Sequence, residues 1–559
     1  MARRRSRTVP TRRAGSVLLD TAPARRRRGR RYGRRRDDGW RRARWGRRLF
    51  LLLLLAALVA GALAWRARTE AADARREAVA RFAAAWEQGD RAVMWRTLSP
   101  TARRAVPERR FVDAYRNAER AAGVRRVQTG RLGSEHDGRI AVPVAIRTEV
   151  FGSLRGTLAV PVSGSGDEAG VDWNFALRLP GLRRDEAVVR RSGPEPRRAQ
   201  ILAADGRRLD ATPLGASIAG RSGDQPTGLE RVYDDRLGGH PSARLLFGDR
   251  VIARTRAVRG RPVRTFFDPG LAAAAQSALG GKLGGVTALR PSDGAVLALA
   301  GLAVSAPQPP GSTFKVITTA AALDRGIVKP STTFPVQTGA TLSGVTLRNA
   351  SGEACGGTLQ QAFAESCNSV FAPLGAKLGA KRLVAAARAF GFGEKPRIPA
   401  AETSTISPAR ALADDLAVGS AAIGQEKDLA TPLAMASVAG TIATDGRRAV
   451  PRVARVDTVV RRRAVSRRAA QQVRSMMIDV VRSGTGTSAA VPGVTVAGKT
   501  GTAELQPNSS DPRDADAWFV AFAPAERPRI AVAVMLVGAG FGGTAAAPVA
   551  REVIQAALG

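Results

Sequence analysis

An uninterrupted apolar segment near the start of the chain decides how the rest of it can fold. Residues 49–65, LFLLLLLAALVAGALAW, contain no charged side chain, and arginines flank them on both sides. Seventeen residues lie at the short end of the length that a helix needs to span a bilayer. The sequence therefore predicts a transmembrane anchor here, with most of the chain after it.

Charge on the two sides of this segment predicts its orientation. Residues 1–48 carry 20 Arg and 3 Asp, a net of +17 within a chain of net charge +41, and are expected to form a disordered basic tail. Because basic residues stay on the cytoplasmic side, we expect this tail in the cytoplasm, near anionic lipid, and residues 66–559 outside. A tail that binds nucleic acid is the alternative on composition alone. The expected orientation keeps residues 66–559 away from nucleic acid, so no such partner is expected.

A cleaved export signal is the other interpretation of the apolar segment. Residues 62–64, Ala-Leu-Ala, resemble a cleavage site. A tail of 48 residues is long for a signal of that kind, which favours a retained anchor. No cysteine lies near the segment, so a bacterial lipid anchor is not expected.

Cysteine and histidine are too scarce for several kinds of site. The chain has two of each: Cys355, Cys367, His136 and His240. A structural zinc needs about four such ligands, and neither histidine lies in a motif that suits a Ser-His-Asp triad. No metal and no cofactor are expected. In an exported chain the two cysteines, with eleven residues between them, either form a disulfide or stay as buried thiols, and both remain open.

Hydrophobic periodicity predicts a small α+β domain after the anchor. Residues 71–122 have a helical pattern, in which Val79, Phe82 and Trp86 form one buried stripe. Alternating stretches follow between residues 140 and 164, and alternation is typical of strands. Helices followed by a curved sheet indicate the α+β class.

A longer C-terminal domain begins near Thr265, after residues 181–262, which are rich in Arg, Gly and Pro. We expect a linker and a small pedestal in that preceding stretch. The longer domain is predicted to begin with a β-hairpin over residues 285–300 and a helix over 312–325. Three further strands are expected over residues 494–505, 517–523 and 529–537, and a closing helix over 548–558.

Three short motifs of the C-terminal domain carry hydroxyl, amine and amide groups. The first contains Ser312 and Lys315 in S-x-x-K, the second Ser366 and Asn368 in S-x-N, and the third begins with Lys499 in K-T-G. Each pattern occurs once in the chain. A single one is weak, but the trio in this order indicates one catalytic site.

The first motif pairs a nucleophile with a base. Ser312 and Lys315 share a face of the predicted helix, and a lysine amine takes a serine proton when burial or positive charge lowers its pKa. Ser312 also opens that helix, where the dipole and free N–H groups favour negative charge developing on a substrate. Only 8 of the 88 basic residues are lysines. This usage favours a role that arginine cannot fill, because arginine is not deprotonated in proteins.

The other two motifs supply polar groups to the same cleft. Ser366 suits a proton relay and Asn368 the binding of a substrate amide, after a helix that a capping box opens. The third motif lies on an expected edge strand, where Lys499 could meet a substrate carboxylate. Gly501 would let a ligand backbone approach closely, and the N–H of Thr502 could donate to an oxyanion.

The trio resembles the active site shared by penicillin-binding proteins and serine β-lactamases. Residues 171–182, 228–239, 424–446 and 514–524 are similar to further segments of monofunctional, class B penicillin-binding proteins. Residues 70–180 resemble the cone-shaped, nuclear-transport-factor-2-like domain of the methicillin-resistance type. The resemblance implies an α+β fold in which a transpeptidase domain, an antiparallel sheet flanked by helices, follows a transmembrane helix and that cone domain.

The resemblance also implies a domain order. A cytoplasmic tail over residues 1–48 comes first, followed by an anchor over 49–65 and the cone domain over 66–182. A linker or pedestal then covers residues 183–262, and the transpeptidase domain covers 263–559. The pedestal is shorter than expected for this family, which puts a partner surface in doubt. The stretch between the hairpin and Ser312 is also shorter, which puts a substrate-side loop in doubt. The motif of peptidoglycan glycosyltransferases is absent from the sequence, so a bifunctional enzyme is not expected.

The resemblance further implies that the chain is a peptidoglycan D,D-transpeptidase that β-lactams acylate. Ser312 would form an acyl-enzyme on the penultimate D-Ala of a stem peptide and pass it to an acceptor amine. A glycosyltransferase of the cell-wall machinery is the expected partner. Lys315 would be the general base, Ser366 the proton relay and Asn368 the group that positions the amide. Lys499 and Thr500 would bind the carboxylate. The N–H groups of Ser312 and Thr502 would donate to the oxyanion.

Two other classes share parts of this pattern. A class A β-lactamase needs a general base for deacylation in an E-x-x-L-N-like loop, but the nearest candidate, Glu402, is followed by Thr-Ser-Thr-Ile. A non-catalytic membrane scaffold would not need the intact serines, lysines and asparagine of the motifs. Two further residues stay open: Gln425 either lines the cleft or packs, and Trp518 is expected in the core.

Overall fold

The computed structural model describes residues 39–425, 427–505 and 511–559. The chain divides after Glu186 into two compact units, an N-terminal one and a C-terminal one. The basic tail predicted over residues 1–48 lies largely outside the described residues.

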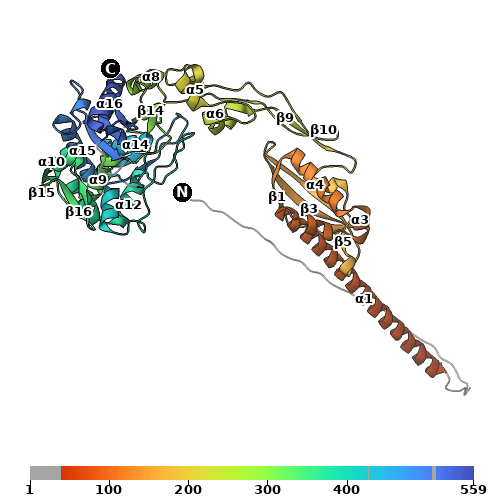
Figure 1. Ribbon diagram of the computed structural model, residues 1–559. Coiled ribbons are helices and arrows are strands. Elements are labelled where there is room, and N and C mark those ends of the chain that lie inside the picture. Colours follow the sequence, from red (N-terminus) through yellow and green to blue (C-terminus); the bar gives the residue numbers. More distant parts are fainter. Residues whose placement is uncertain (1–38, 426, 506–510) are drawn as a thin grey trace, which may run out of the picture. The chain divides into compact units, whose positions relative to one another are not determined.

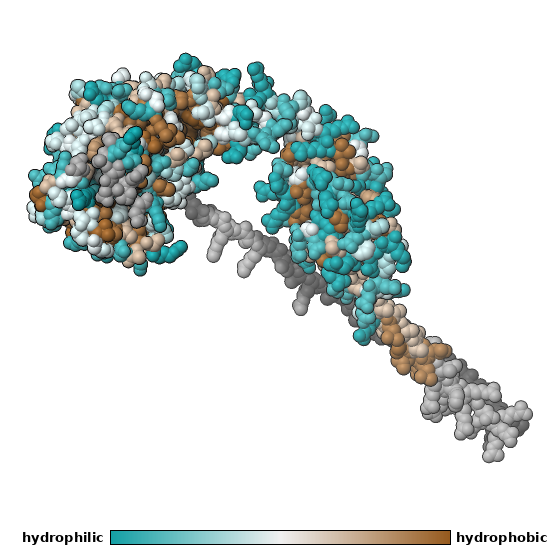
Figure 2. Space-filling model, in the orientation of Figure 1, coloured by the Kyte–Doolittle hydropathy of each residue, from teal (hydrophilic) through white to brown (hydrophobic). Residues whose placement is uncertain are grey.

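The N-terminal unit begins with α1, a helix of 50 residues over Gly39–Gln88 (Figure 1). Within the described residues, α1 is the one helix long and apolar enough to cross a membrane, with the qualifying stretch over Leu51–Gln88. Its apolar side chains from Leu51 to Trp65 are exposed, and Figure 2 shows them as a brown band. The predicted anchor is therefore part of one continuous helix, whose far end belongs to the folded body of the unit.

The body of the N-terminal unit packs helices on a curved antiparallel sheet. The predicted stripe is confirmed, because Val79, Phe82 and Trp86 are all at most 2% exposed. Tyr115 lies against Trp86, with ring centroids 5.7 Å apart. The helices are α2 (Arg91–Arg96), α3 (Pro100–Ala105) and α4 (Glu108–Ala122). The strands are β1 (Val124–Thr129), β2 (Glu135–His136), β3 (Arg139–Thr148), β4 (Ser153–Ser163) and β5 (Gly170–Val171).

The C-terminal unit begins with short strands and helices, in the stretch predicted to form a linker and a small pedestal. A three-stranded sheet has the order β10-β9-β6, with β6 at Val188–Ser192, β9 at Ala243–Phe247 and β10 at Arg250–Thr255. The helices of this region are α5 (Pro213–Ala219), α6 (Gly228–Val232) and α7 (Asp234–Gly238). Its two-stranded pairs join β7 (Ile201–Leu202) to β12 (Val263–Arg264), and β8 (Gly239–His240) to β11 (Val258–Arg259).

A five-stranded antiparallel sheet forms the centre of the C-terminal unit, in the order β14-β13-β23-β22-β21. The predicted hairpin and late strands are confirmed in it. The bounds are β13 Gly284–Arg290, β14 Ala295–Gly301, β21 Ala497–Glu504, β22 Ala515–Ala523 and β23 Ile530–Leu536. Strand β21, which carries K-T-G, is an edge strand, as predicted.

Two apolar cores lie on the two faces of this sheet. One face packs against α8 (Pro269–Leu279) and α16 (Gly542–Leu558). The other packs against α14 (Pro432–Ala443) and the remaining helices. These are α9 (Lys315–Asp324), α10 (Leu359–Glu365), α11 (Asn368–Leu378), α12 (Ala380–Phe390), α13 (Asp415–Ala422) and α15 (Arg467–Arg482). Figure 1 shows this helical layer beside the sheet.

Short two-stranded sheets connect to the helices of this unit. They join β15 (Thr333–Gln337) to β18 (Cys355–Thr358), β16 (Gly339–Leu342) to β17 (Val345–Arg348), and β19 (Arg447–Ala449) to β20 (Arg461–Arg463).

Two predicted helix boundaries need correction. The helix expected from Ser312 starts as a 3-10 turn over Gly311–Phe314, and the α-helix proper begins at Lys315. The closing helix, expected from Pro548, starts at Gly542 and contains that proline in its interior. Proline was therefore a poor marker of this helix start, although it usually favours the first turn.

Candidate active site

The turn before α9 presents the predicted nucleophile and base together. Ser312 lies in the 3-10 turn, three residues before Lys315, and side chains at that spacing eclipse in a 3-10 geometry. Among the described residues, the Ser312 hydroxyl has no hydrogen-bond partner. Lys315 is fully buried. The turn is held by Thr313, whose hydroxyl donates to the Pro310 carbonyl at 2.6 Å.

The S-x-N motif lies at the junction of α10 and α11, facing the Lys315 amine. The predicted capping box opens α10, and the helix ends at Ser366, which has the left-handed φ of 66°. Asn368 then opens α11. The Lys315 amine donates to the Ser366 carbonyl at 2.6 Å and to Oδ1 of Asn368 at 2.7 Å, and its distance to Oγ of Ser366 is 3.4 Å.

The K-T-G motif brings a second lysine to the same hydroxyl. The Lys499 amine donates to Oγ of Ser366 at 2.7 Å and to the Thr500 carbonyl at 3.0 Å. Ser366 therefore lies between two lysine amines that come from different elements. Lys499 is fully buried and Thr500 is 6% exposed.

Burial lowers the pKa of both lysines, so each ammonium group is a stronger acid than an exposed lysine. Desolvation, with the charge of Lys499 as a second cause, holds the pKa of Lys315 well below its usual 10.5. Desolvation also lowers the pKa of Lys499, to about 7. The charge of Lys499 thus favours the neutral form of the Lys315 amine. The pair is suited to one neutral amine that accepts a proton and one cation that holds an anion.

Gly501 packs closely against the turn that carries Ser312. A Cβ at this position would lie 2.8 Å from Cγ2 of Thr313 and 2.9 Å from the Pro310 carbonyl. A Cβ at Gly311 would in turn meet the Thr502 carbonyl at 2.5 Å. These glycines let the nucleophile turn and β21 approach each other, which brings the backbones of Ser312 and Thr502 together. That Gly501 also lets a ligand backbone approach closely stays a prediction.

Two polar residues support K-T-G from neighbouring segments. Oγ1 of Thr485 lies 2.6 Å from Oγ1 of Thr500 and 3.3 Å from the Ala364 carbonyl of α10. Gln425 donates to the Thr502 carbonyl at 3.5 Å, so it reaches the motif strand. Thr485 was not among the predicted site residues. No local pattern marks it, because its contacts form only when α10 and β21 meet.

A disulfide and a buried tryptophan complete the surroundings of the site. Cys355 in β18 and Cys367 in the S-x-N motif are bonded to each other, with Cα atoms 5.8 Å apart. Of the two open alternatives, the structure therefore has the disulfide. Trp518 is fully buried on β22, opposite Gly501, as expected of a core residue.

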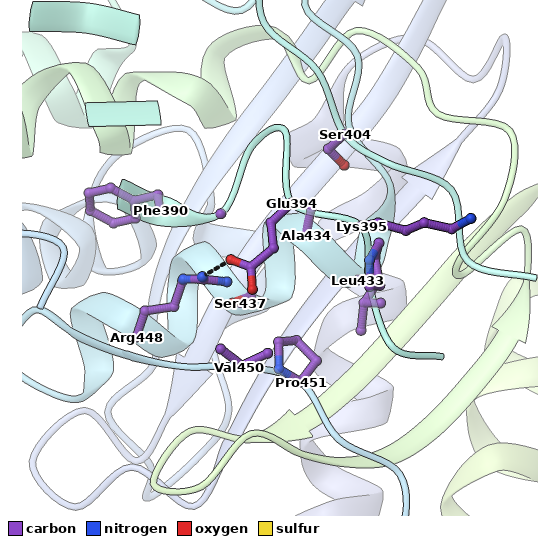
Figure 3. Close-up of a pocket in the computed structure, with 12 residues that line it drawn as sticks. Phe390, Glu394, Lys395, Ser404, Leu433, Ala434, Ser437, Arg448, Val450 and Pro451 are labelled. Carbon is purple, nitrogen blue, oxygen red and sulfur yellow. Dashed lines mark hydrogen bonds and ion pairs between the residues drawn. The ribbon is translucent and has the colours of Figure 1, made fainter. Parts of the chain in front are cut away.

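A separate pocket of the C-terminal unit lies outside the three motifs (Figure 3). It has a volume of about 40 Å³ and is lined mainly by the end of α12, the loop after it, α14 and β19. Arg448 forms an ion pair there with Glu394, to which Arg462 also binds at 3.2 Å. No motif residue lines this pocket, so it is not part of the candidate active site.

The fold and this site together define the serine transpeptidases that bind penicillin. Residues 284–555 match the family model described as the penicillin binding protein transpeptidase domain. The chain belongs to this family and is a serine-type D,D-transpeptidase.

Individual relatives refine the comparison. The peptidoglycan D,D-transpeptidase PbpA of Mycobacterium tuberculosis (strain ATCC 25618 / H37Rv) is 37% identical over 401 residues, which cover 59% of this chain and 79% of the relative. PbpA of Mycolicibacterium smegmatis is 37% identical over 404 residues, which cover 60% and 80%. A solved structure of M. tuberculosis penicillin-binding protein A, a ceftriaxone acyl-enzyme complex, is 32% identical with a TM-score of 0.56. The match covers 65% of this chain and 99% of the chain in that structure.

Proposed function

We propose that this chain catalyses peptidoglycan cross-linking through Ser312, as a D,D-transpeptidase of the PbpA kind. The observation that carries the assignment is the hydrogen-bonded chain from Lys315 through Ser366 to Lys499, built from three separate motifs. A structural role does not explain two fully buried lysines around one serine hydroxyl, because burying a charged amine is costly. Proton transfer does explain them.

Acylation begins at the 3-10 turn. The Ser312 hydroxyl attacks the carbonyl of the penultimate D-Ala of a stem peptide, and its proton passes to the neutral Lys315 amine. The N–H groups of Ser312 and Thr502 donate to the oxyanion that forms. When the tetrahedral intermediate collapses, the C–N bond breaks and the acyl group stays on Ser312.

The leaving D-Ala takes its proton through Ser366. The hydroxyl of Ser366 donates to the leaving nitrogen and is reprotonated from the lysine pair. Asn368 positions the donor amide by its side chain. An acceptor amine then attacks the Ser312 ester, which forms the new peptide bond and returns the serine.

The third motif fixes the end of the stem peptide. Lys499 and the Thr500 hydroxyl bind its terminal carboxylate, with Gly501 and Thr502 beside them on β21. β-Lactams carry a comparable carboxylate next to a strained amide, so we propose that they acylate Ser312 as well. The ceftriaxone acyl-enzyme of the M. tuberculosis relative supports this.

The remaining parts of the chain would place this site outside the cytoplasm. We propose that residues 49–65 are a retained anchor with a cytoplasmic N-terminus, because arginine is in excess before them. Residues 66–182 would be the cone domain, residues 183–262 the pedestal and residues 263–559 the transpeptidase domain. A glycosyltransferase that makes the glycan strands would be the partner, since this chain needs them as substrate.

Labelling with a fluorescent penicillin tests the assignment in the full-length chain. Wild type in isolated membranes should be labelled, and Ser312→Ala should not. Ser277→Ala, an exposed serine of α8, is the matched control and should label like wild type. Labelling of Ser312→Ala at the wild-type rate would refute the nucleophile. Rapid repeated turnover of nitrocefin by wild type would favour a β-lactamase instead.

A further inference from the structure

Three arginines stand in one row across the three-stranded sheet of the C-terminal unit. Arg191 on β6 pairs with Arg244 on β9, and Arg244 pairs with Arg254 on β10. Residues directly opposite each other in an antiparallel sheet project from the same face, on strands about 4.8 Å apart. All three arginines are exposed. The face therefore carries three guanidinium groups side by side.

This arginine row has no counter-charge of its own. In the described part of the chain, no carboxylate pairs with Arg191, Arg244 or Arg254. Nearby arginines differ, since Arg207 pairs with Asp205 and Arg208 with Asp210. Like charges directly opposite each other destabilise a sheet. A register that places three of them together costs stability, which an anionic partner would recover.

An apolar row lies beside the arginine row. Val189 and Val251 both pair with Leu246, two residues along β9 from Arg244 and so on the same face. Val189 is 39% exposed and Val251 is 38% exposed, whereas Leu246 between them is 8% exposed, so the two valines are the accessible part of this row. A partner that fits this face has anionic groups next to small apolar groups.

We propose that this face docks uncross-linked peptidoglycan strands through the carboxylates of their stem peptides. The inference rests on the proposed function, which makes those peptides the substrate. A guanidinium binds a carboxylate with two parallel hydrogen bonds, and the alanine methyl beside each terminal carboxylate suits the valines. Since the row and the active site belong to the same unit, a second contact raises the local concentration of stem peptides.

Co-sedimentation with purified insoluble peptidoglycan tests the docking. The full-length protein in detergent is first acylated with penicillin G, so that the active site is occupied. The variant R191Q/R244Q/R254Q should bind at least about threefold more weakly than wild type, the loss expected when three exposed ion pairs are removed. The matched control R382Q/R388Q/R551Q removes three exposed, scattered arginines of the same unit and should bind like wild type.

The chemistry of the partner is tested on the peptidoglycan itself. Amidation of its carboxylates with a carbodiimide and an excess of a simple amine should abolish the difference between wild type and the triple variant. Removal of phosphate-containing wall polymers with hydrofluoric acid should leave binding unchanged. Three results would overturn the proposal: equal binding by the triple variant, an equal loss in the control, or a loss after hydrofluoric acid, which would identify a phosphate polymer as the occupant.

The failure of this docking and the failure of the proposed function can be told apart. The triple variant should react with fluorescent penicillin at the wild-type rate, which also shows that it folds. If wild type itself fails to react with penicillin, the proposed function is wrong, and Ser312→Ala then serves for the sedimentation in place of the acylated protein. If reaction is normal and sedimentation does not distinguish the variants, only the docking is wrong.

Discussion

Two buried lysines with different tasks dominate the site at the scale of single residues. The Lys315 amine donates to a backbone carbonyl and an amide oxygen, so in its neutral form both hydrogens would be bound and the lone pair would be free for the proposed nucleophile. Lys499 lies on the strand that would hold the substrate carboxylate, and its amine donates to Oγ of Ser366. In the proposed mechanism the first loses its proton and the second keeps it. Replacement by arginine separates these needs, since arginine keeps its charge and cannot act as a base.

Lys315→Arg should abolish acylation by fluorescent penicillin, with a loss of at least about a hundredfold, because removal of a general base costs 10²–10⁴-fold. Lys499→Arg should leave partial acylation, since a guanidinium still binds a carboxylate. The measurement is the acylation rate of each full-length variant, with folding checked by a thermal melt. Equal and mild losses in both variants would show that positive charge alone suffices and that Lys315 is not the base.

The pH dependence of acylation should show both lysines. As pH falls, the Lys315 amine takes up a proton and stops acting as a base, so the rate drops on the acid side. As pH rises through about 7, the pKa of Lys499, that amine loses the charge that binds the carboxylate, so the rate drops again. Lys499→Arg should lack the fall on the alkaline side only. Second-order acylation rates across the pH range check this, and the same alkaline fall in Lys499→Arg would contradict it.

Thr485 should matter through Thr500. Its hydroxyl lies between the Thr500 hydroxyl and the Ala364 carbonyl, so it sets the direction of the hydrogen bond of Thr500. Thr485→Val, which keeps the shape, should slow acylation by about 2–10-fold, the effect of one neutral hydrogen bond. Thr485→Ser should restore most of the rate. Equal rates for the valine variant and wild type would show that this hydroxyl only fills space.

At the scale of elements, the sequence predicted the parts with strong local signals. The hairpin of β13 and β14, the K-T-G edge strand and the capping box of α10 were all readable from alternation, turn residues and spacing. Strand β1, with the sequence VRRVQT, has little alternation and was missed, since pairing with β3 decides it. The close packing of Gly501 against Thr313 was not predicted, because the turn that contains Thr313 lies far away in sequence.

The disulfide ties two elements of the site, the strand β18 and the start of α11. Replacement of both cysteines, Cys355→Ser with Cys367→Ser, should lower stability by about 2–4 kcal/mol through the freed loop, and should slow acylation because Ser366 and Asn368 flank Cys367. Dithiothreitol should bring wild type to the melting temperature of the double variant and leave the variant unchanged. Intact mass after alkylation of unreduced, denatured protein gives an independent check. Two added labels would contradict the bridge.

At the scale of the whole molecule, one helix has two different environments along its length. The part of α1 up to Trp65 exposes leucines at 47–63%, whereas Val79 and Trp86 further along are buried in the body of the N-terminal unit. No break separates the two parts in the structure. The anchor segment was readable from hydropathy, but its fusion with the first helix of the folded unit was not, because arginines between them resemble a boundary. A continuous helix ties the first folded unit closely to the anchor.

The orientation of this helix can be tested on whole cells. If residues 49–65 are a retained anchor with a cytoplasmic N-terminus, external protease on spheroplasts should leave a protected fragment of about 7 kDa, the tail and the span. The fluorescent penicillin label on Ser312 should disappear from the membrane at the same time, because the transpeptidase domain is then exposed to the protease. An epitope tag at the N-terminus makes the fragment visible, and protease added after permeabilisation with detergent should remove it.

A mature protein that begins near Trp65 by N-terminal sequencing would contradict retention. Protection of the whole chain in spheroplasts would contradict the orientation, and with it access of this enzyme to the cell wall.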